Sequence, residues 1–201
     1  MALYDRRTLE GVYSVRQSVI YIQNYRYAEE RMMRMMAGWI ALTPELAVKL
    51  EMAKQVYEDA LHTDALGKRL PELRCGRKSV AASESPNPGF AQLVQAVTEP
   101  ERPDQTIEKL VGVFDVLKPH LIDVYERTAL ETDQIADAPT IEILEDVLRR
   151  TRRHVAWGQE VLERLCDTDA RRERRRARAA ALRAHLIACG GVTGDLAPGT
   201  A

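Results

Sequence analysis

Apolar residues recur at spacings of three and four along almost every long segment of this chain, and this periodicity restricts it to an all-α fold. In the first segment, residues 8–39, the stripe consists of Ile22, Tyr25, Met32, Met33, Met36 and, just beyond the segment, Ile40. Comparable helices are predicted over residues 44–70, 105–132, 137–166 and 168–188, with a short helix over residues 90–97. We find no segment with the alternation of apolar and polar residues that marks a strand.

Prolines and a long connection organise these helices. Thr43 is predicted to cap the second helix, with Pro44 in the first helical position, where its missing N–H costs nothing. Pro119 lies inside the third long helix and is expected to kink it. Residues 75–103 are rich in Gly, Ser, Pro and Asn and form one long crossover. Four long helices, this crossover and an additional C-terminal helix predict a four-helix bundle of the ferritin-like kind.

Length and composition fit one globular domain. The chain has 201 residues, 45% apolar and 29% charged, with a net charge of −1. We assign residues 1–188 to the helical domain and residues 189–201 to a flexible C-terminal tail. The sequence contains neither a membrane-length apolar run nor a secretory signal, so we expect a cytoplasmic protein. Its three cysteines, an odd number far apart in the sequence, are then expected to be reduced thiols.

A glutamate in the middle of the first apolar stripe is the first candidate for a functional side chain. Glu29 shares the face of Tyr25 and Met32, so its carboxylate is expected to be buried. A buried charge must be paired, protonated or bound to metal, because an uncompensated one is costly. Glu30 replaces it if the register of the helix differs by one residue. The alternative interpretation is a glutamate that is hydrogen-bonded within a polar layer of the core.

The second and fourth helices each contribute a histidine. Asp59 and His62 are three residues apart, so they lie on one helix face, with Glu58 one turn before His62. The strongest apolar stripe of this helix (Leu46, Leu50, Tyr57, Leu61) lies elsewhere, which favours a solvated His62. His154, in contrast, lies on the apolar face of the fourth helix, although Arg149, Arg152 and Arg153 surround it in the sequence. The residue three positions before His154 is Thr151.

Further polar residues lie near the predicted core. His120 is at the edge of the apolar face of the third long helix, just after Pro119, and Glu131 returns to that face. Arg150 is close to the inward face of the fourth helix. We expect His120, Arg150 and Thr151 to be the catalytic side chains around a centre formed by Glu29, Asp59, His62 and His154.

Three stretches resemble a group of bacterial ferritin-like proteins that are often linked to secondary metabolism. They are "AGWIALTPELAVKLEMAKQVYEDALHTDALGKRLPELR", "VLKPHLIDVYERTALETDQIADAPTIEILEDVLRRTRRHVAWG" and "ACGGVTGD", and the resemblance extends from about Tyr21 to Asp195. It implies a carboxylate-bridged di-iron or di-manganese centre that activates oxygen or peroxide. The residues that match the ligand-bearing segments of the family are Glu29 or Glu30, Asp59, His62 and His154. Thr151 departs from the family pattern, which is acidic at this position.

Two functions follow as alternatives. The first is a non-haem iron oxidase or oxygenase that acts on a small molecule in bacterial secondary metabolism. It would bind one or two iron ions, or manganese, through Glu29, Asp59, His62 and His154. The second is a metal-free ferritin-like protein, in which Thr151 and the arginines replaced the site. Such a protein would act as a binding or scaffold module, or as an acid–base enzyme that uses Arg150 and the histidines on an anionic substrate.

Partners are predicted from surface composition. Residues 149–183 contain twelve arginines and five acidic residues, so one end of the molecule is expected to be basic. This block has no interleaved aromatic residues and no recognised reading motif, which argues against nucleic-acid binding. The apolar faces of the first two helices exceed what one bundle core needs to cover, so we expect a homodimer.

Overall fold

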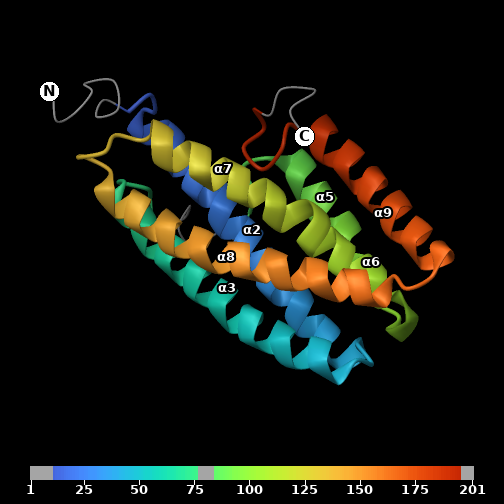
Figure 1. The fold of residues 1–201 in the computed structure, drawn as a ribbon. Helices are drawn as coiled ribbons and strands as arrows, with labels where there is room; N and C mark the ends of the chain where they lie inside the picture. The colour runs from blue at the N-terminus through green and yellow to red at the C-terminus, as the bar shows by residue number, and fades with distance from the viewer. Residues whose placement is uncertain (1–10, 77–83, 196–201) are drawn as a thin grey trace, which may run out of the picture.

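The computed structural model describes residues 11–76 and 84–195, and these residues are entirely helical or irregular (Figure 1). This confirms the all-α prediction. The long helices are α2 (Val15–Leu42), α3 (Leu46–Glu72), α7 (Lys118–Glu131) and α8 (Ala138–Leu165). The remaining elements are α5 (Pro88–Thr98), the 3-10 turn η1 (Pro103–Gln105), α6 (Thr106–Leu110), the π-helix η2 (Val111–Leu117) and α9 (Asp169–Ala188).

The long helices form a bundle through their apolar faces. α2 packs along α3, α3 packs along α8, and α8 packs along α7 and η2. The aromatic rings of Tyr25 and Tyr125 connect α2 with α7 edge to face at 4.8 Å between centroids. At the other end, α9 packs against η2, α6 and α5, and α5 also contacts α2. Figure 1 shows α5, α6 and α9 together at this end of the bundle. Aromatic and aliphatic side chains from these helices form one continuous hydrophobic core.

Several helix boundaries differ from those predicted. Thr43 is not the N-cap of α3: it is the C-cap of α2, where its backbone N–H and its hydroxyl both donate to the carbonyl of Trp39. α3 begins two residues later than expected, after Glu45. The prediction was wrong here because the Thr43 hydroxyl satisfies the end of the preceding helix instead. The boundaries of α8 and α9 agree with the sequence analysis within a residue.

The third long helix contains a π-helical segment in place of a simple kink. Residues Val111–Leu117 are π-helical, and Lys118 donates its backbone N–H to the carbonyl of Val113. Pro119 follows directly, lacks an N–H and would crowd the carbonyl of residue 115 in a regular α-helix. The wider turn just before the proline relieves this conflict. All residues from 109 to 118 are buried, because helices pack around this segment from every side.

η2 and α8 approach each other closely. Phe114 and Trp157 are in edge-to-face contact, with 5.4 Å between ring centroids. Gly158 lies under the Phe114 ring, and a Cβ atom at this position would be only 2.1 Å from Phe114 Cγ. A glycine is therefore required for the two helices to approach this closely.

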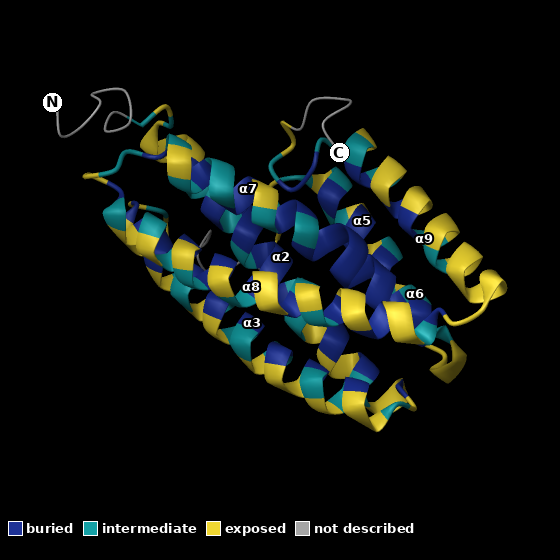
Figure 2. Cartoon of the chain, in the orientation of Figure 1, coloured by how far each residue is buried: buried dark blue, intermediate teal, exposed yellow. Residues whose placement is uncertain are grey.

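α3 presents an unexpected face to solvent. The stripe of Leu46, Leu50, Tyr57 and Leu61 is exposed, whereas Asp59 and His62 are buried (Figure 2). The expectation of a solvated His62 was therefore wrong. Val48, Met52 and Leu66 on the same face as Asp59 supply the apolar contacts that hold this side of α3 against the bundle. On the face of α3 that packs against the core, buried polar residues therefore lie between the apolar ones.

The C-terminal region is attached by polar contacts. Asn87 caps α5 and also donates its side-chain amide to the carbonyls of Cys189 and Gly191. Val192 is buried in the turn that follows α9. Residues 189–195, assigned above to the tail, thus pack against the bundle, while residues 196–201 lie outside the described part. Among the described helices, none is long and apolar enough to cross a membrane.

Candidate functional site

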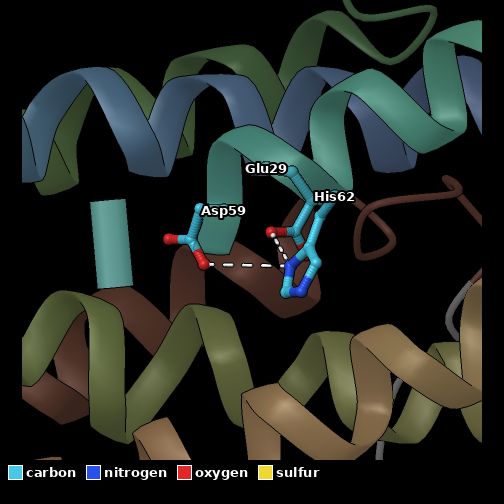
Figure 3. A group of neighbouring side chains, drawn as sticks. All are labelled: Glu29, Asp59 and His62. Atoms are coloured by element: carbon cyan, nitrogen blue, oxygen red, sulfur yellow. Dashed lines mark hydrogen bonds and ion pairs between the residues drawn. The ribbon is translucent and has the colours of Figure 1, made fainter. Parts of the chain in front are cut away.

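Three of the predicted site residues meet in the core of the bundle. Glu29 comes from α2, and Asp59 and His62 come from successive turns of α3 (Figure 3). Their side chains are at most 1% exposed. His62 Nδ1 lies 3.1 Å from Glu29 Oε2 and 3.9 Å from Asp59 Oδ1. One ligand atom from each of the three residues lies within 4.8 Å of the others.

A lysine from the third long helix completes this cluster. Lys118 is fully buried, and its Nζ lies 2.8 Å and 3.1 Å from the two carboxylate oxygens of Asp59. The same Nζ lies 2.8 Å from His154 Nδ1. Only a protonated amine has three hydrogens to donate to three such acceptors. The geometry therefore describes an ammonium group in the centre of the bundle.

His154 occupies a defined tautomer. Its Nε2 lies 2.6 Å from Glu58 Oε2, so this nitrogen donates to the carboxylate and Nδ1 accepts from Lys118. Burial lowers the pKa of His154 to about 2, and the positive charge of Lys118 lowers it further in the same direction. The imidazole is therefore neutral at physiological pH. Glu58, at the edge of the cluster, also lies near Arg153 and Arg150.

The two buried carboxylates differ in their environments. Burial raises the pKa of Asp59 to about 6, against the opposing charge of Lys118. Burial also favours a higher pKa for Glu29. The pKa of Glu29 is nevertheless below its ordinary value, because it is lowered by His62, Lys118 and Tyr125. Tyr125 donates to Glu29 Oε1 at 2.8 Å, and its own pKa is raised well above 10 by burial. The phenol therefore acts as a hydrogen-bond donor to the carboxylate.

The remaining predicted residues lie around the cluster or apart from it. Thr151 is buried one turn before His154, and its hydroxyl has no hydrogen-bond partner within the described residues. Arg150 is at the rim, 3.0 Å from Asp146 and 3.6 Å from Glu58. Glu30 faces away and pairs with Arg34. Glu29 is thus the member of the glutamate pair that enters the cluster.

His120 contacts the C-terminal region of the chain. Its Nε2 accepts a hydrogen bond from the backbone N–H of Val192 at 2.9 Å, so it holds the turn after α9. Burial lowers the pKa of His120 to about 4; Arg127 lowers it further and Asp195 opposes this. In the structure this side chain therefore attaches the C-terminal region to α7.

This contact predicts a pH dependence of stability. In the unfolded chain His120 binds a proton near pH 6.5, whereas the folded chain resists protonation down to about pH 4. Acidification therefore favours unfolding within this window, and stability lost on going from pH 7 to pH 5 amounts to roughly 2 kcal/mol for this group. In urea unfolding at the two pH values, the variant His120→Leu should lose less stability than the native chain. An identical loss in both proteins would contradict this role.

The cluster does not fit a centre of two metal ions. The Lys118 ammonium donates to both Asp59 oxygens and to His154 Nδ1, so these ligand candidates already have a cationic partner. Its charge repels a divalent cation, and Thr151 supplies no carboxylate to balance one. Glu29, Asp59 and His62 remain as a set that could surround a single ion.

Sequence reasoning missed Lys118 and Tyr125. Lys118 was overlooked because it lies within the apolar run "VGVFDVLKP", where helical periodicity does not distinguish inward from outward positions. The available signal was the charge itself, since a lysine inside such a run must find a buried acceptor.

Comparisons with family models, with curated proteins and with solved structures find no match to this chain. The arrangement of the cluster is therefore the basis on which a function can be argued.

Proposed function

We propose that this chain is a ferritin-like protein in which a buried ammonium group has taken the place of a metal centre, and that it acts as a metal-independent scaffold protein. The observation that carries the proposal is the position of Lys118 Nζ between Asp59 and His154. In a helical bundle of this kind, carboxylates from facing helices need a cation to offset their buried charge. Lys118 supplies that cation within the chain itself.

The surroundings of the cluster support this proposal. The side chains of Asp59 and Lys118 have no exposed surface. Three of the hollows on the described surface are lined by other residues, at α2–α5, at α2–α3 and at α8–α9. A cluster of this kind holds α2, α3, α7 and α8 in one register, which is a structural role.

Metal analysis tests the proposal. We expect the protein, purified without chelator and then treated anaerobically with ferrous iron, to retain less than about a tenth of an equivalent of iron after desalting. Its thermal unfolding midpoint should be the same with and without a chelator. The variant His62→Ala is the matched control, because it removes a ligand candidate and should leave the metal content unchanged. Near-stoichiometric iron that is lost in His62→Ala would contradict the proposal.

One observation favours a second candidate function. Glu29, Asp59 and His62 each offer a ligand atom within 4.8 Å of the others, a donor set that suits a single divalent ion. A bound iron ion would supply oxygen activation for the oxidation of a small molecule in bacterial secondary metabolism. In that case these three residues would hold the ion, and Tyr125 would orient the Glu29 carboxylate through its hydrogen bond. The iron measurement distinguishes this candidate from the metal-independent one.

A further inference from the structure

The outward face of α3 carries a continuous row of apolar side chains. We define the α3 stripe as Leu46, Leu50, Ala53, Tyr57 and Leu61. Its four large side chains are exposed: Leu46 to 68%, Leu50 to 58%, Tyr57 to 66% and Leu61 to 38%. Figure 2 shows exposed residues along the whole outer edge of this helix. A contiguous apolar row on a surface helix is the usual mark of an interaction site.

The stripe is symmetric about the midpoint between Ala53 and Lys54. Leu50 and Tyr57 lie three and a half positions on either side of this point, and Leu46 and Leu61 lie seven and a half positions away. At 100° per residue, all four fall within about 30° of one direction. When two such helices cross antiparallel about this midpoint, Leu50 of one copy meets Tyr57 of the other. Leu46 likewise meets Leu61 of the second copy.

The centre of the stripe also suits a copy of itself. Ala53 is small and exposed, so two helices can approach closely where they cross. Lys54 beside it is paired with Glu51 at 3.1 Å within the chain. The two lysines that meet near the axis therefore bring their own counter-ions, and each can also reach the glutamate of the other copy. Charge and shape at the crossing are thus compatible with an identical surface.

We propose that the α3 stripe is the twofold interface between two copies of this chain. Isologous contact requires that each residue of a patch meets a partner within the same patch, and the four large residues of the stripe satisfy this condition as the pairs Leu46–Leu61 and Leu50–Tyr57. One helix pair buries less surface than a standard interface, so the association is expected to be in the micromolar range. The inference is independent of whether the buried cluster holds a metal ion.

Sedimentation velocity at tens of micromolar protein tests the association. The native chain should sediment as a dimer, and Leu50→Glu should shift it to monomer, weakening association by at least about a hundredfold, because two charges would be buried at the crossing. Leu130→Glu is the matched control: Leu130 is 77% exposed on α7 and lies outside the stripe, so this variant should remain dimeric. A native monomer, or a dimer that survives Leu50→Glu, would overturn the proposal.

A cross-linking experiment tests the symmetry itself. A cysteine introduced as Ala53→Cys lies at the twofold axis and should form an intermolecular disulfide under mild oxidation. Ala47→Cys, also at an exposed position of the same helix, lies about 20 Å from its counterpart in this arrangement and should not form the disulfide. Equal cross-linking of both variants, or none in Ala53→Cys, would overturn the antiparallel crossing. Neither result would affect the metal measurement that tests the scaffold proposal.

Discussion

Replacing Lys118 by methionine is expected to lower the free energy of unfolding by about 3 to 5 kcal/mol. Lys118 is the cation beside Asp59, and both side chains are fully buried. Methionine has a similar length but no charge, so the variant leaves the Asp59 carboxylate without its partner. Urea unfolding followed by circular dichroism at pH 7 measures the loss.

Two further variants determine whether the loss arises from the buried charge. Lys68→Met removes an ion pair of the same chemistry with Asp64, but both members are largely exposed, so we expect a change within about 0.5 kcal/mol. The double variant Lys118→Met with Asp59→Asn should recover part of the stability, because neither charge then remains in the core. If Lys118→Met cost no more than Lys68→Met, the ammonium would not be the group that compensates Asp59.

Gly158→Ala is expected to be the other strongly destabilising single substitution, with a loss of about 2 to 3 kcal/mol or more. The added Cβ would lie 2.1 Å from Phe114 Cγ and 2.5 Å from Phe114 Cβ. Because one of these atoms is bound directly to the backbone, rotation of the ring cannot remove the clash. η2 and α8 would have to separate, and the edge-to-face contact of Phe114 with Trp157 would be lost.

Gly38→Ala provides the opposite control. Gly38 is exposed within α2, and a Cβ at this position would meet nothing within 4 Å. Alanine should therefore stabilise the protein by about 0.5 to 1 kcal/mol through its higher helix propensity. Thermal unfolding of the two glycine variants should move in opposite directions. A shift in the same direction would show that the close approach at Gly158 does not determine the outcome.

The helical architecture was predictable from sequence because amphipathic periodicity repeats over segments of twenty residues and more. The same method failed on α3, for a physical reason. It assigned the inward face to the strongest apolar stripe, but that stripe faces solvent, and Asp59 and His62 face the core. A helix wheel treats every apolar stripe as a face that is buried within the same chain. A surface that binds another molecule selects them too, and the wheel cannot separate the two causes.

The candidate site was predictable in part. Glu29 and His154 were identified because each is a polar residue centred on an apolar face, and the structure buries both. Lys118 was not identified, since every residue from 109 to 118 is buried and no face can be distinguished there. Tyr125 was not identified either, although exposed Asp123 shows that this part of the helix does have an outer face. Their roles depend on which residues of other helices lie opposite, and only the three-dimensional arrangement supplies this information.

The π-helical segment Val111–Leu117 makes the position of Lys118 depend on residue count as well as residue type. A π turn contains one residue more than an α turn, so the helix has absorbed the equivalent of a one-residue insertion. Relative to an uninterrupted α-helix, every side chain after it points about 100° away. Insertion or deletion of one residue before Lys118 would therefore change which residue of this helix points into the core. No residue of the cluster would have to be substituted for this to happen.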